Sequence, residues 1–339
     1  MRIVHAVRSD AFAGVESHVA RLARAQLAQG DQVIVIGGHQ ERMRAAIGHG
    51  VRTIDATTVT GVLRAVHQVG RGADVVHAHM TAAEIACAAG LQGRRTPLVV
   101  TRHFARTRGS NPVSALVGAA AATRVSRQLA ISRWVADSIA GASVVVHPGV
   151  DVFDETPVAA DREQVVLLAQ RLEPEKETDL AIRAFAASGL ADAGWRLDVA
   201  GDGGERERLE KLVGELGLSA ATRFLGHRDD VTSLMARSAV LLAPCRVEGL
   251  GLTVLEAMAT ALPVVAVAAG GHLETVGVLS GAALHPPGDA AAASRLLVGL
   301  AGDPVRRDAY GHALQEIQRE RFTPEHQAAQ TALVYEAVV

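Results

Sequence analysis

Two glutamates, Glu248 and Glu256, stand eight positions apart around a turn that contains two glycines, Gly249-Leu250-Gly251. The turn follows an apolar run, and a helical pattern begins after it at Leu252-Thr253. Glycines let a backbone approach a ligand closely, and the amino end of a helix offers free N–H groups to a phosphate. Carboxylates accept hydrogen bonds from paired sugar hydroxyls. The segment predicts a site for a ligand that carries both groups, whereas the plainer alternative is a capped helix with a solvated glutamate.

Two cations, Arg171 and Lys176, follow an earlier apolar run. A departing diphosphate gains negative charge in the transition state, and cations aimed at it accelerate the step. Arginine offers a planar fork of donors and lysine a compact charge. The chain contains no Asp-x-Asp pair, so we expect protein groups rather than a metal ion to stabilise such a leaving group. The alternative is a surface ion cluster with Glu173, Glu175 and Glu177.

Composition narrows the class of protein. A length of 339 residues is typical of two domains, and 3% aromatic residues leave the cores to Ala, Val and Leu. The two cysteines lie far apart, which excludes a disulfide framework and a cysteine zinc site. Early charges argue against a secretory signal, and Gly and Pro interrupt the longest uncharged run. We therefore expect a soluble cytoplasmic protein.

Apolar runs alternate with amphipathic segments along the whole chain. In the first half, strands are expected at 3–7, 33–36, 75–77, 98–101, 128–131 and 144–147, and helices at 15–28, 62–69, 82–89 and 135–139. A loop at 106–112 precedes an Ala-rich helix. In the second half, strands are expected at 165–169, 197–200, 223–225, 240–243 and 263–267, and helices at 178–187, 205–216, 230–236, 252–260, 290–300 and 305–321.

This alternation predicts two doubly wound, Rossmann-like α/β domains in tandem, facing each other across a cleft, with ligands at the carboxyl ends of the strands. The boundaries are expected at 1–150 and 151–323, with a linker that includes 154–157. A last helix at 324–339, capped by Thr323, is a candidate to return to the first domain.

The order of several strand-end motifs carries a resemblance over nearly the whole chain. They are Gly14-Val15-Glu16, Val76–His79, Thr101–His103, Gly149–Asp151, Leu168–Lys176, Val199–Gly203 and Phe224–His227, followed by the Glu248 segment. Together they resemble the retaining nucleotide-sugar glycosyltransferases of the two-domain GT-B fold, family 4-like, with its Glu-x7-Glu pattern. The resemblance implies transfer of a sugar from a UDP- or GDP-sugar to an acceptor hydroxyl with retention and without a metal or other cofactor.

The resemblance also implies roles for single residues. As catalytic residues it gives His103 near the transferred sugar's primary hydroxyl, Glu248 on that sugar, and Arg171 and Lys176 on the diphosphate. The residues implied in binding the donor are Gly14, Gly201, Gly226, His227, Gly249, Leu250, Gly251, Leu252, Thr253 and Glu256, the last on the ribose. The candidates on the acceptor side are Glu16, His79, Arg102, Arg106 and Arg108. We expect one of His77 and His79 to face the cleft and neither to bind metal.

Some positions depart from the family's pattern. The first loop has Ala13-Gly14 where two glycines are usual, Leu250 replaces an aromatic residue, and Gln170 and Glu177 replace small residues. None of these changes removes a charged contact. We therefore expect them to affect which sugar and base fit rather than the reaction.

Charge is divided unevenly along the chain. Residues 1–150 carry a formal charge of +9 and residues 151–339 one of −11. Eight arginines of the first half lie between positions 94 and 133: Arg94, Arg95, Arg102, Arg106, Arg108, Arg124, Arg127 and Arg133. This pattern suits either an anionic partner or an Arg-rich solvated surface. Because the following helix is mostly Ala and Val, a soluble acceptor is favoured over a lipid-linked one with peripheral membrane contact.

Three other functions remain as alternatives. A sugar phosphorylase or nucleotide-sugar epimerase would share the phosphate pocket, and a non-catalytic partner subunit would share the fold. The intact set of Glu248, Glu256, Arg171 and Lys176 argues against the non-catalytic subunit. Low aromatic content and the absence of a known binding module argue against a nucleic-acid partner.

Overall fold

The computed structural model describes residues 1–109, 111–153, 157–158 and 161–339. The chain divides into two compact units: unit 1 is Met1–Val150 with Phe322–Val339, and unit 2 is Asp151–Arg321. The linker expected at 154–157 and the loop expected at 106–112 fall partly outside the described residues, at 154–156 and at 110.

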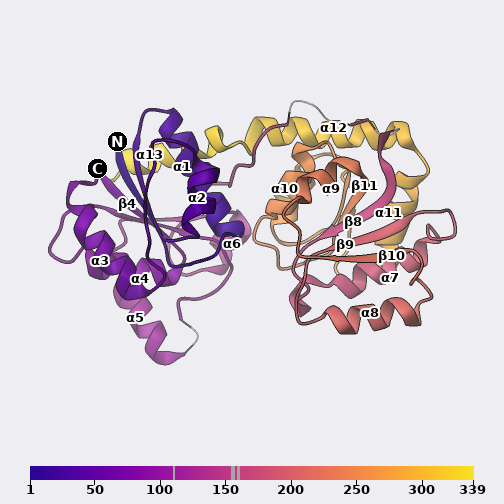
Figure 1. Ribbon diagram of the computed structural model, residues 1–339, viewed down its shortest axis with the longest axis horizontal. Coiled ribbons are helices and arrows are strands. Elements are labelled where there is room, and N and C mark those ends of the chain that lie inside the picture. Colours follow the sequence, from indigo (N-terminus) through magenta and orange to yellow (C-terminus); the bar gives the residue numbers. More distant parts are fainter. Residues whose placement is uncertain (110, 154–156, 159–160) are drawn as a thin grey trace. The chain divides into compact units, whose positions relative to one another are not determined.

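Unit 1 is built on a parallel sheet covered by helices (Figure 1). The sheet has seven strands in the order β3-β2-β1-β4-β5-β6-β7. Its strands are β1 (Arg2–Val7), β2 (Gln32–Ile36), β3 (Arg52–Ile54), β4 (Val75–His79), β5 (Leu98–Arg102), β6 (Arg127–Ala130) and β7 (Val144–Val145). Its helices are α1 (Gly14–Ala28), α2 (Gln40–Ile47), α3 (Val59–Val69), α4 (Thr81–Gly90), α5 (Pro112–Ala122), α6 (Arg133–Ser138) and α13 (Pro324–Glu336). The strand order reverses between β1 and β4, where ligands of such sheets bind.

Small aliphatic side chains form the layers of unit 1. On one face, α3 and α4 pack on the sheet through residues such as Val66 and Ala86. On the other face, α1 and α2 pack through residues such as Val19 and Met43. The helices α4 and α5 are in contact, as are α1 and α13.

The last helix joins unit 1 through specific contacts. Thr323 caps α13 by accepting a hydrogen bond from the His326 N–H at 3.1 Å, and Tyr335 packs into the core beside Ile3 and Val75. A Cβ atom on Gly149 would lie 2.2 Å from the Thr323 backbone, so only glycine lets these two segments approach this closely. The helix therefore covers the centre of the unit 1 sheet.

Unit 2 repeats the architecture with a six-stranded parallel sheet in the order β10-β9-β8-β11-β12-β13. Its strands are β8 (Glu163–Ala169), β9 (Arg196–Ala200), β10 (Thr222–Gly226), β11 (Ser238–Ala243), β12 (Val264–Val267) and β13 (Leu284–His285). Its α-helices are α7 (Thr178–Ser188), α8 (Arg206–Glu215), α9 (Val231–Arg237), α10 (Leu252–Ala259), α11 (Ala290–Ala301) and α12 (Pro304–Arg321). Phe185 of α7, Leu209 of α8 and Leu297 of α11 share one buried cluster with the sheet.

Among the α-helices and strands of the described residues, three do not follow from the sequence pattern, namely α2, β3 and β13. The α2 segment, QERMRAAI, is too polar to show a clear helical stripe, and only Met43 and Ile47 of it are buried. The strands β3 and β13 have three and two residues, which is too short for an alternating pattern. Among the helices of the described part, none is long and apolar enough to cross a bilayer.

Candidate active site

Lys176 and Glu248 meet at the carboxyl ends of two neighbouring strands of unit 2. Lys176 lies in the loop after β8 and Glu248 in the loop after β11, and these strands pair in parallel. The Lys176 Nζ atom is 2.6 Å from the Glu248 Oε2 atom, and both side chains are partly buried. The topology therefore brings together two of the residues that the sequence predicted as catalytic.

The ion pair keeps both of its members charged. Burial works against the charged form of Lys176, but the Glu248 carboxylate outweighs it and raises the pKa of the lysine. Burial likewise opposes ionisation of Glu248, yet Lys176 lowers the pKa of that carboxyl below its usual value. His272 is buried close by, and burial lowers its pKa to about 4, so it is neutral near pH 7.

Backbone contacts fix the turn that follows Glu248. The Gly271 N–H donates to the Glu248 carbonyl oxygen at 2.9 Å, and a Cβ on Gly271 would lie 2.2 Å from the Leu250 Cα. Gly251 adopts a positive φ of 92° at the start of α10, and no side chain caps this helix. The first amides of α10, which include those of Leu252 and Thr253, are therefore available to an anion.

Gln170 holds the loop that carries Lys176. Its Nε2 donates to the Lys176 carbonyl oxygen and to Thr178 Oγ1, each at 2.9 Å. Glu177 has a φ of 51°, unusual for a residue with a side chain, and its carboxylate lies 3.4 Å from the Arg246 Nε. Gln170 and Glu177, two of the residues that depart from the family's pattern, thus shape the Lys176 loop.

The side chain of Arg171 pairs with Glu175 rather than with Lys176 or Glu248. Its side chain is 66% exposed, and its Nη2 is 3.4 Å from the Glu175 carboxylate. This is the surface ion pair of the alternative interpretation. A role for Arg171 on a diphosphate stays a prediction.

Two further strand ends of unit 2 carry predicted donor residues. Gly201 donates its N–H to the Gly226 carbonyl oxygen at 2.8 Å, and a Cβ on Gly201 would lie 1.9 Å from the Gln170 carbonyl oxygen. The glycine is therefore required for the loops after β8 and β9 to approach. His227 is 78% exposed beyond β10, and Glu256 is half-buried on α10.

In unit 1, the predicted residues of the first loop lie at the start of α1. Gly14 is the first residue of the helix and is exposed. Glu16 is buried, and its carboxylate accepts a hydrogen bond from the Ala13 N–H at 2.9 Å. This carboxylate therefore holds the loop in place, and a contact with an acceptor stays a prediction.

Two of the arginines predicted on the acceptor side lie beside the carboxylate of a buried glutamate, Glu84. Arg108 Nε lies 2.8 Å from the Glu84 carboxylate, and Arg102 Nη1 lies 4.0 Å from it. Arg102 is itself buried and donates to the Arg106 carbonyl oxygen at 2.6 Å. Of the three arginines, the Arg106 side chain is the one left exposed.

Five buried histidines gather near the carboxyl ends of β1, β4 and β5. They are His5, His18, His77, His79 and His103. His77, His79 and His103 stand in motifs of the sequence, whereas His5 and His18 do not, because a single histidine on a strand or helix has no pattern of its own. A useful signal was present, since His5, His77 and His79 lie on strands that pair directly.

His77 and His79 do not alternate between the two sides of the sheet, as the expectation that only one of them faces the cleft requires. Residues two apart on a strand point to the same side of the sheet. The two imidazoles are stacked with ring centroids 4.3 Å apart, and both are fully buried. His79 contacts His103 instead of solvent, with 3.2 Å between His79 Nδ1 and His103 Nε2.

All five histidines are held neutral near pH 7. Burial lowers the pKa of His5 to about 4 and that of His103 to about 3. For His18, His77 and His79, burial and the neighbouring histidines hold the pKa well below its usual value. Two groups, His5-His77-His79 and His18-His79-His103, have ring nitrogens within 4.8 Å of one another, so their spacing could hold a metal ion.

These depressed pKa values predict acid-sensitive folding. Below pH 6.5 the unfolded chain binds protons that the buried histidines do not, so stability falls as the pH drops from about 6.5 towards 4. Each such histidine contributes a slope of about 1.4 kcal/mol per pH unit. We expect the urea midpoint, followed by circular dichroism at pH 7, 6 and 5, to fall steeply. His5→Gln should flatten this dependence, whereas the matched change at the exposed His49 should not; an unchanged midpoint at pH 5 would contradict the prediction.

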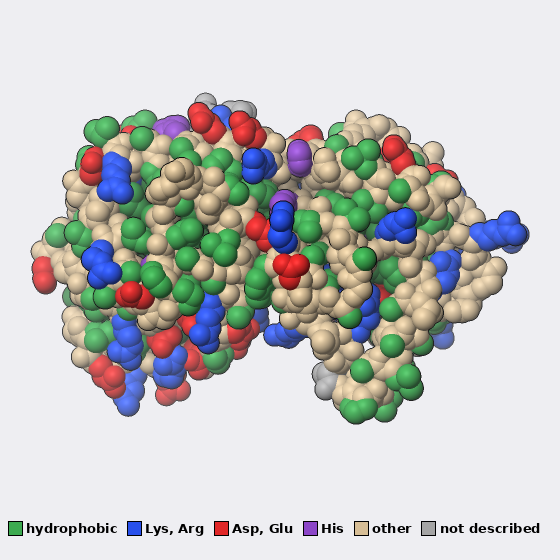
Figure 2. All heavy atoms as spheres, turned by 180° about the vertical axis from the view of Figure 1, so that it is seen from behind, with side chains coloured by type: hydrophobic (Ala, Val, Ile, Leu, Met, Phe, Trp, Pro, Cys, Tyr) green, Lys and Arg blue, Asp and Glu red, His purple; other side chains and the backbone are tan. Residues whose placement is uncertain are grey.

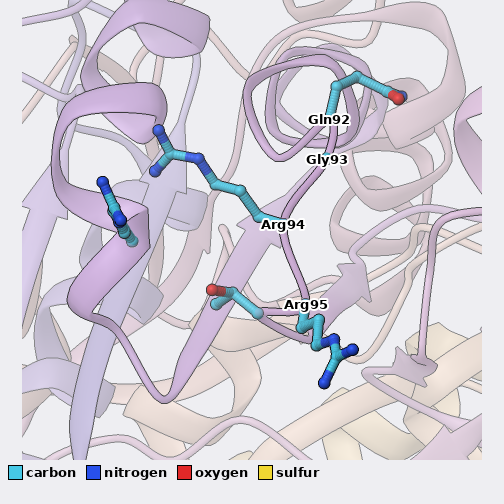
Figure 3. Close-up of a pocket in the computed structure, with 6 residues that line it drawn as sticks. Gln92, Gly93, Arg94 and Arg95 are labelled. Atoms are coloured by element: carbon cyan, nitrogen blue, oxygen red, sulfur yellow. The ribbon is translucent and has the colours of Figure 1, made fainter.

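A separate open pocket lies at the other end of the unit 1 sheet. It has a volume of about 450 Å³ and is lined by residues before β4 and β5, including Arg71, Arg94 and Arg95 (Figure 3). The amino ends of these strands face away from His79 and His103, which lie at their carboxyl ends. The pocket is therefore distinct from the predicted site.

Comparisons with known proteins assign the chain to a family. The profile described as Glycosyl transferases group 1 matches residues 151–316, and that of Glycosyltransferase Family 4 matches residues 12–152. The chain is 28% identical over 310 residues to 2-deoxystreptamine glucosyltransferase of Streptomyces kanamyceticus, which covers 79% of this chain and 78% of that protein. It is 32% identical over 155 residues to an exopolysaccharide phosphotransferase of Streptomyces coelicolor, spanning 45% of this chain and only 16% of that protein.

The fold has a solved counterpart over its full length. The crystal structure of HepE from Anabaena in complex with UDP superimposes with a TM-score of 0.83 at 22% identity, covering 99% of this chain and 100% of that one. HepE has also been solved in complex with UDP-glucose. The two family profiles together span almost the whole chain, and both units have the parallel α/β architecture of this fold. The chain therefore belongs to the family 4 glycosyltransferases, glycosyl transferases group 1, with the GT-B fold.

Proposed function

We propose that this glycosyltransferase moves a sugar from a UDP-sugar to an acceptor hydroxyl with retention of configuration and without a metal ion. The observation that carries the proposal is the Lys176–Glu248 pair, which lies 2.6 Å apart at the carboxyl ends of β8 and β11. It combines a cation suited to a diphosphate with a carboxylate suited to sugar hydroxyls, next to the uncapped start of α10.

The chemistry follows from where charge develops. As the sugar–phosphate bond breaks, negative charge builds on the diphosphate, where Lys176 and the first amides of α10 stabilise it. Glu248 accepts hydrogen bonds from hydroxyls of the transferred sugar, Glu256 holds the ribose, and Arg171 supplies a second cation. For retention, the acceptor attacks on the same face of the sugar from which the leaving group departs, and the departing phosphate takes the acceptor's proton. His103, which belongs to unit 1, contacts a hydroxyl group of the substrate.

The choice of UDP is supported by HepE, which binds UDP and UDP-glucose, and the test is a thermal-shift screen. A ligand that binds only the folded state stabilises it by RT ln(1 + [L]/Kd). We expect UDP and UDP-sugars to raise the melting temperature more than the GDP, ADP and TDP series. A larger shift with GDP-sugars would reassign the donor.

Product analysis separates transfer from its alternatives. We propose 2-deoxystreptamine as the first acceptor to test, because a relative is named a 2-deoxystreptamine glucosyltransferase. Incubation with this acceptor and the preferred UDP-sugar should yield a glycoside whose anomeric configuration, measured by ¹H NMR, matches that of the donor. A product of inverted configuration would contradict the retaining mechanism. Phosphate-dependent formation of a sugar 1-phosphate would indicate a phosphorylase instead, a new nucleotide sugar would indicate an epimerase, and no turnover would favour the non-catalytic subunit.

We propose a soluble acceptor, which predicts weak membrane binding. The similarity over four fifths of the chain to a 2-deoxystreptamine glucosyltransferase supports it, and so does the pairing of Arg102 and Arg108 with Glu84. In liposome co-sedimentation, we expect little binding to anionic vesicles at physiological salt. The feature that opposes this expectation is α5, where Val113 and Leu116 are each 73% exposed and apolar side chains gather over the helix (Figure 2).

The same assay with Leu116→Asp provides the control. If binding to anionic vesicles is tight, sensitive to salt and lost in this variant, then a lipid-linked acceptor becomes the better proposal. Binding that is equally weak in both proteins agrees with a soluble acceptor.

A further inference from the structure

A chain of hydrogen bonds links the core of unit 1 to His103. Gln26 Oε1 lies 2.7 Å from His5 Nε2, His5 Nδ1 lies 3.1 Å from His79 Nε2, and His79 Nδ1 lies 3.2 Å from His103 Nε2. All four side chains are buried. They come from α1, β1, β4 and the end of β5, so the sheet order itself lines them up.

Counting protons along this chain gives it a direction. A neutral imidazole has one N–H and one lone pair, and an amide oxygen only accepts. Because the Gln26 oxygen accepts from His5 Nε2–H, His5 Nδ1 holds a lone pair and accepts from His79 Nε2–H. His79 Nδ1 then accepts from His103 Nε2–H. The remaining nitrogen, His103 Nδ1, keeps its lone pair and makes no hydrogen bond to any described residue.

The other half of the Gln26 amide is compatible with the same orientation. Burial raises the pKa of Tyr335, and a hydrogen bond with the Gln26 side chain acts against this rise. The Tyr335 oxygen lies 2.6 Å from His77 Nδ1, and His77 Nε2 lies 2.7 Å from Thr101 Oγ1. With Gln26 donating to Tyr335, the tyrosine donates to His77, which donates in turn to Thr101. One amide orientation thus satisfies both branches.

The hydrogen bonds at His18 argue against a metal ion in the cluster. The Gly149 N–H donates to Gln327 Oε1 at 2.8 Å, so the Gln327 Nε2 amino group must face His18 Nε2, which is 3.2 Å away. His18 Nε2 therefore holds the lone pair, and Nδ1 holds the proton. His79 belongs to both histidine groups whose spacing could hold a metal ion, and in this network its Nε2 is protonated and its Nδ1 lone pair is already engaged by His103.

We propose that Gln26, His5 and His79 are positioning residues that hold His103 as its Nε2–H tautomer, so that His103 Nδ1 accepts a hydrogen bond from a substrate hydroxyl. The hydroxyl contact rests on the proposed function, whereas the tautomer does not. The carbonyl of Gln26 decides the direction, because reversing the amide would reverse every bond and turn His103 Nδ1 into a donor. Gln26, which is three hydrogen bonds away from His103, thereby sets whether His103 offers the substrate an acceptor or a donor.

The direct test is ¹⁵N NMR of histidine-labelled protein without substrate, which distinguishes the two tautomers by the couplings of the ring nitrogens. We expect His103, His79 and His5 all to be neutral with the proton on Nε2 at pH 7.5. A proton on His103 Nδ1, a charged imidazole, or a zinc ion found at one per chain with shifted ring nitrogens would overturn the proposal. Because no substrate is present, this result is independent of whether sugar transfer is found.

Variants of Gln26 test the link to turnover. Gln26→Met removes the accepting oxygen, and we expect His103 to show both tautomers and kcat to fall about two- to tenfold with donor KM unchanged. Gln26→Glu keeps an acceptor towards His5 and should retain the Nε2–H tautomer and most of kcat. Gln29→Met, at the exposed residue that directly follows α1, is the matched control and should change neither. An unaltered tautomer and kcat in Gln26→Met would refute the relay, whereas His103→Ala with full activity would refute the proposed contact alone.

Discussion

Replacing Lys176 by alanine should lower kcat/KM by about 10²–10³-fold, the loss typical of removing a preorganised donor from a developing negative charge. The variant removes the cation nearest Glu248 and leaves that carboxylate partly buried without this partner. Donor binding and turnover should weaken together, because the diphosphate is charged in both the ground state and the transition state. Steady-state kinetics with the donor identified by thermal shift measure both parameters.

The chain offers a matched control for this change. Lys211 on α8 is its other lysine, is 79% exposed, and should tolerate alanine without loss of activity. Arg171→Ala should lower activity less than Lys176→Ala, since its guanidinium is exposed and lies beside Glu175. EDTA should leave wild-type activity unchanged. A strict need for added Mn²⁺ or Mg²⁺ would show that the diphosphate is handled by a metal ion.

Most of the fold could be predicted because its elements bury long apolar faces. Strands such as β11 and β12 are largely apolar runs in which every side chain is buried, and helices such as α1 repeat apolar residues at helical spacing. Periodicity reports burial, so elements that bury little remain invisible to it. This is why the polar helix α2 and the short edge strand β3 were missed.

The sequence predicts which strand ends carry the site residues, but it does not predict the contacts between their side chains. Residues after neighbouring parallel strands share one sheet edge, which is enough to expect Lys176 near Glu248. The hydrogen bond between them depends on side-chain conformations that no spacing encodes. The contacts of the unit 1 arginines were hidden for the same reason, because a count of arginines does not show that Glu84 pairs with Arg108 and approaches Arg102.

The histidine cluster shows a different limit. His5 and His18 are separated along the sequence from His103 by about a hundred residues, and only the sheet order and the packing of α1 bring them together. Their neutrality comes from burial, which sequence spacing does not report. Contacts of this kind become readable once strands are placed next to one another.

Glu248→Gln should leave nucleotide affinity nearly unchanged while lowering kcat by about 10–150-fold. The carboxylate is expected to hold sugar hydroxyls, and losing a charged hydrogen bond that strengthens in the transition state costs about 1.5–3 kcal/mol. Calorimetric titration with UDP and steady-state kcat measure the two quantities. Glu256→Gln is the contrasting variant, since it should weaken UDP binding through the ribose. Equal loss of UDP affinity in both variants, or full turnover in Glu248→Gln, would contradict the proposed contact between Glu248 and the transferred sugar.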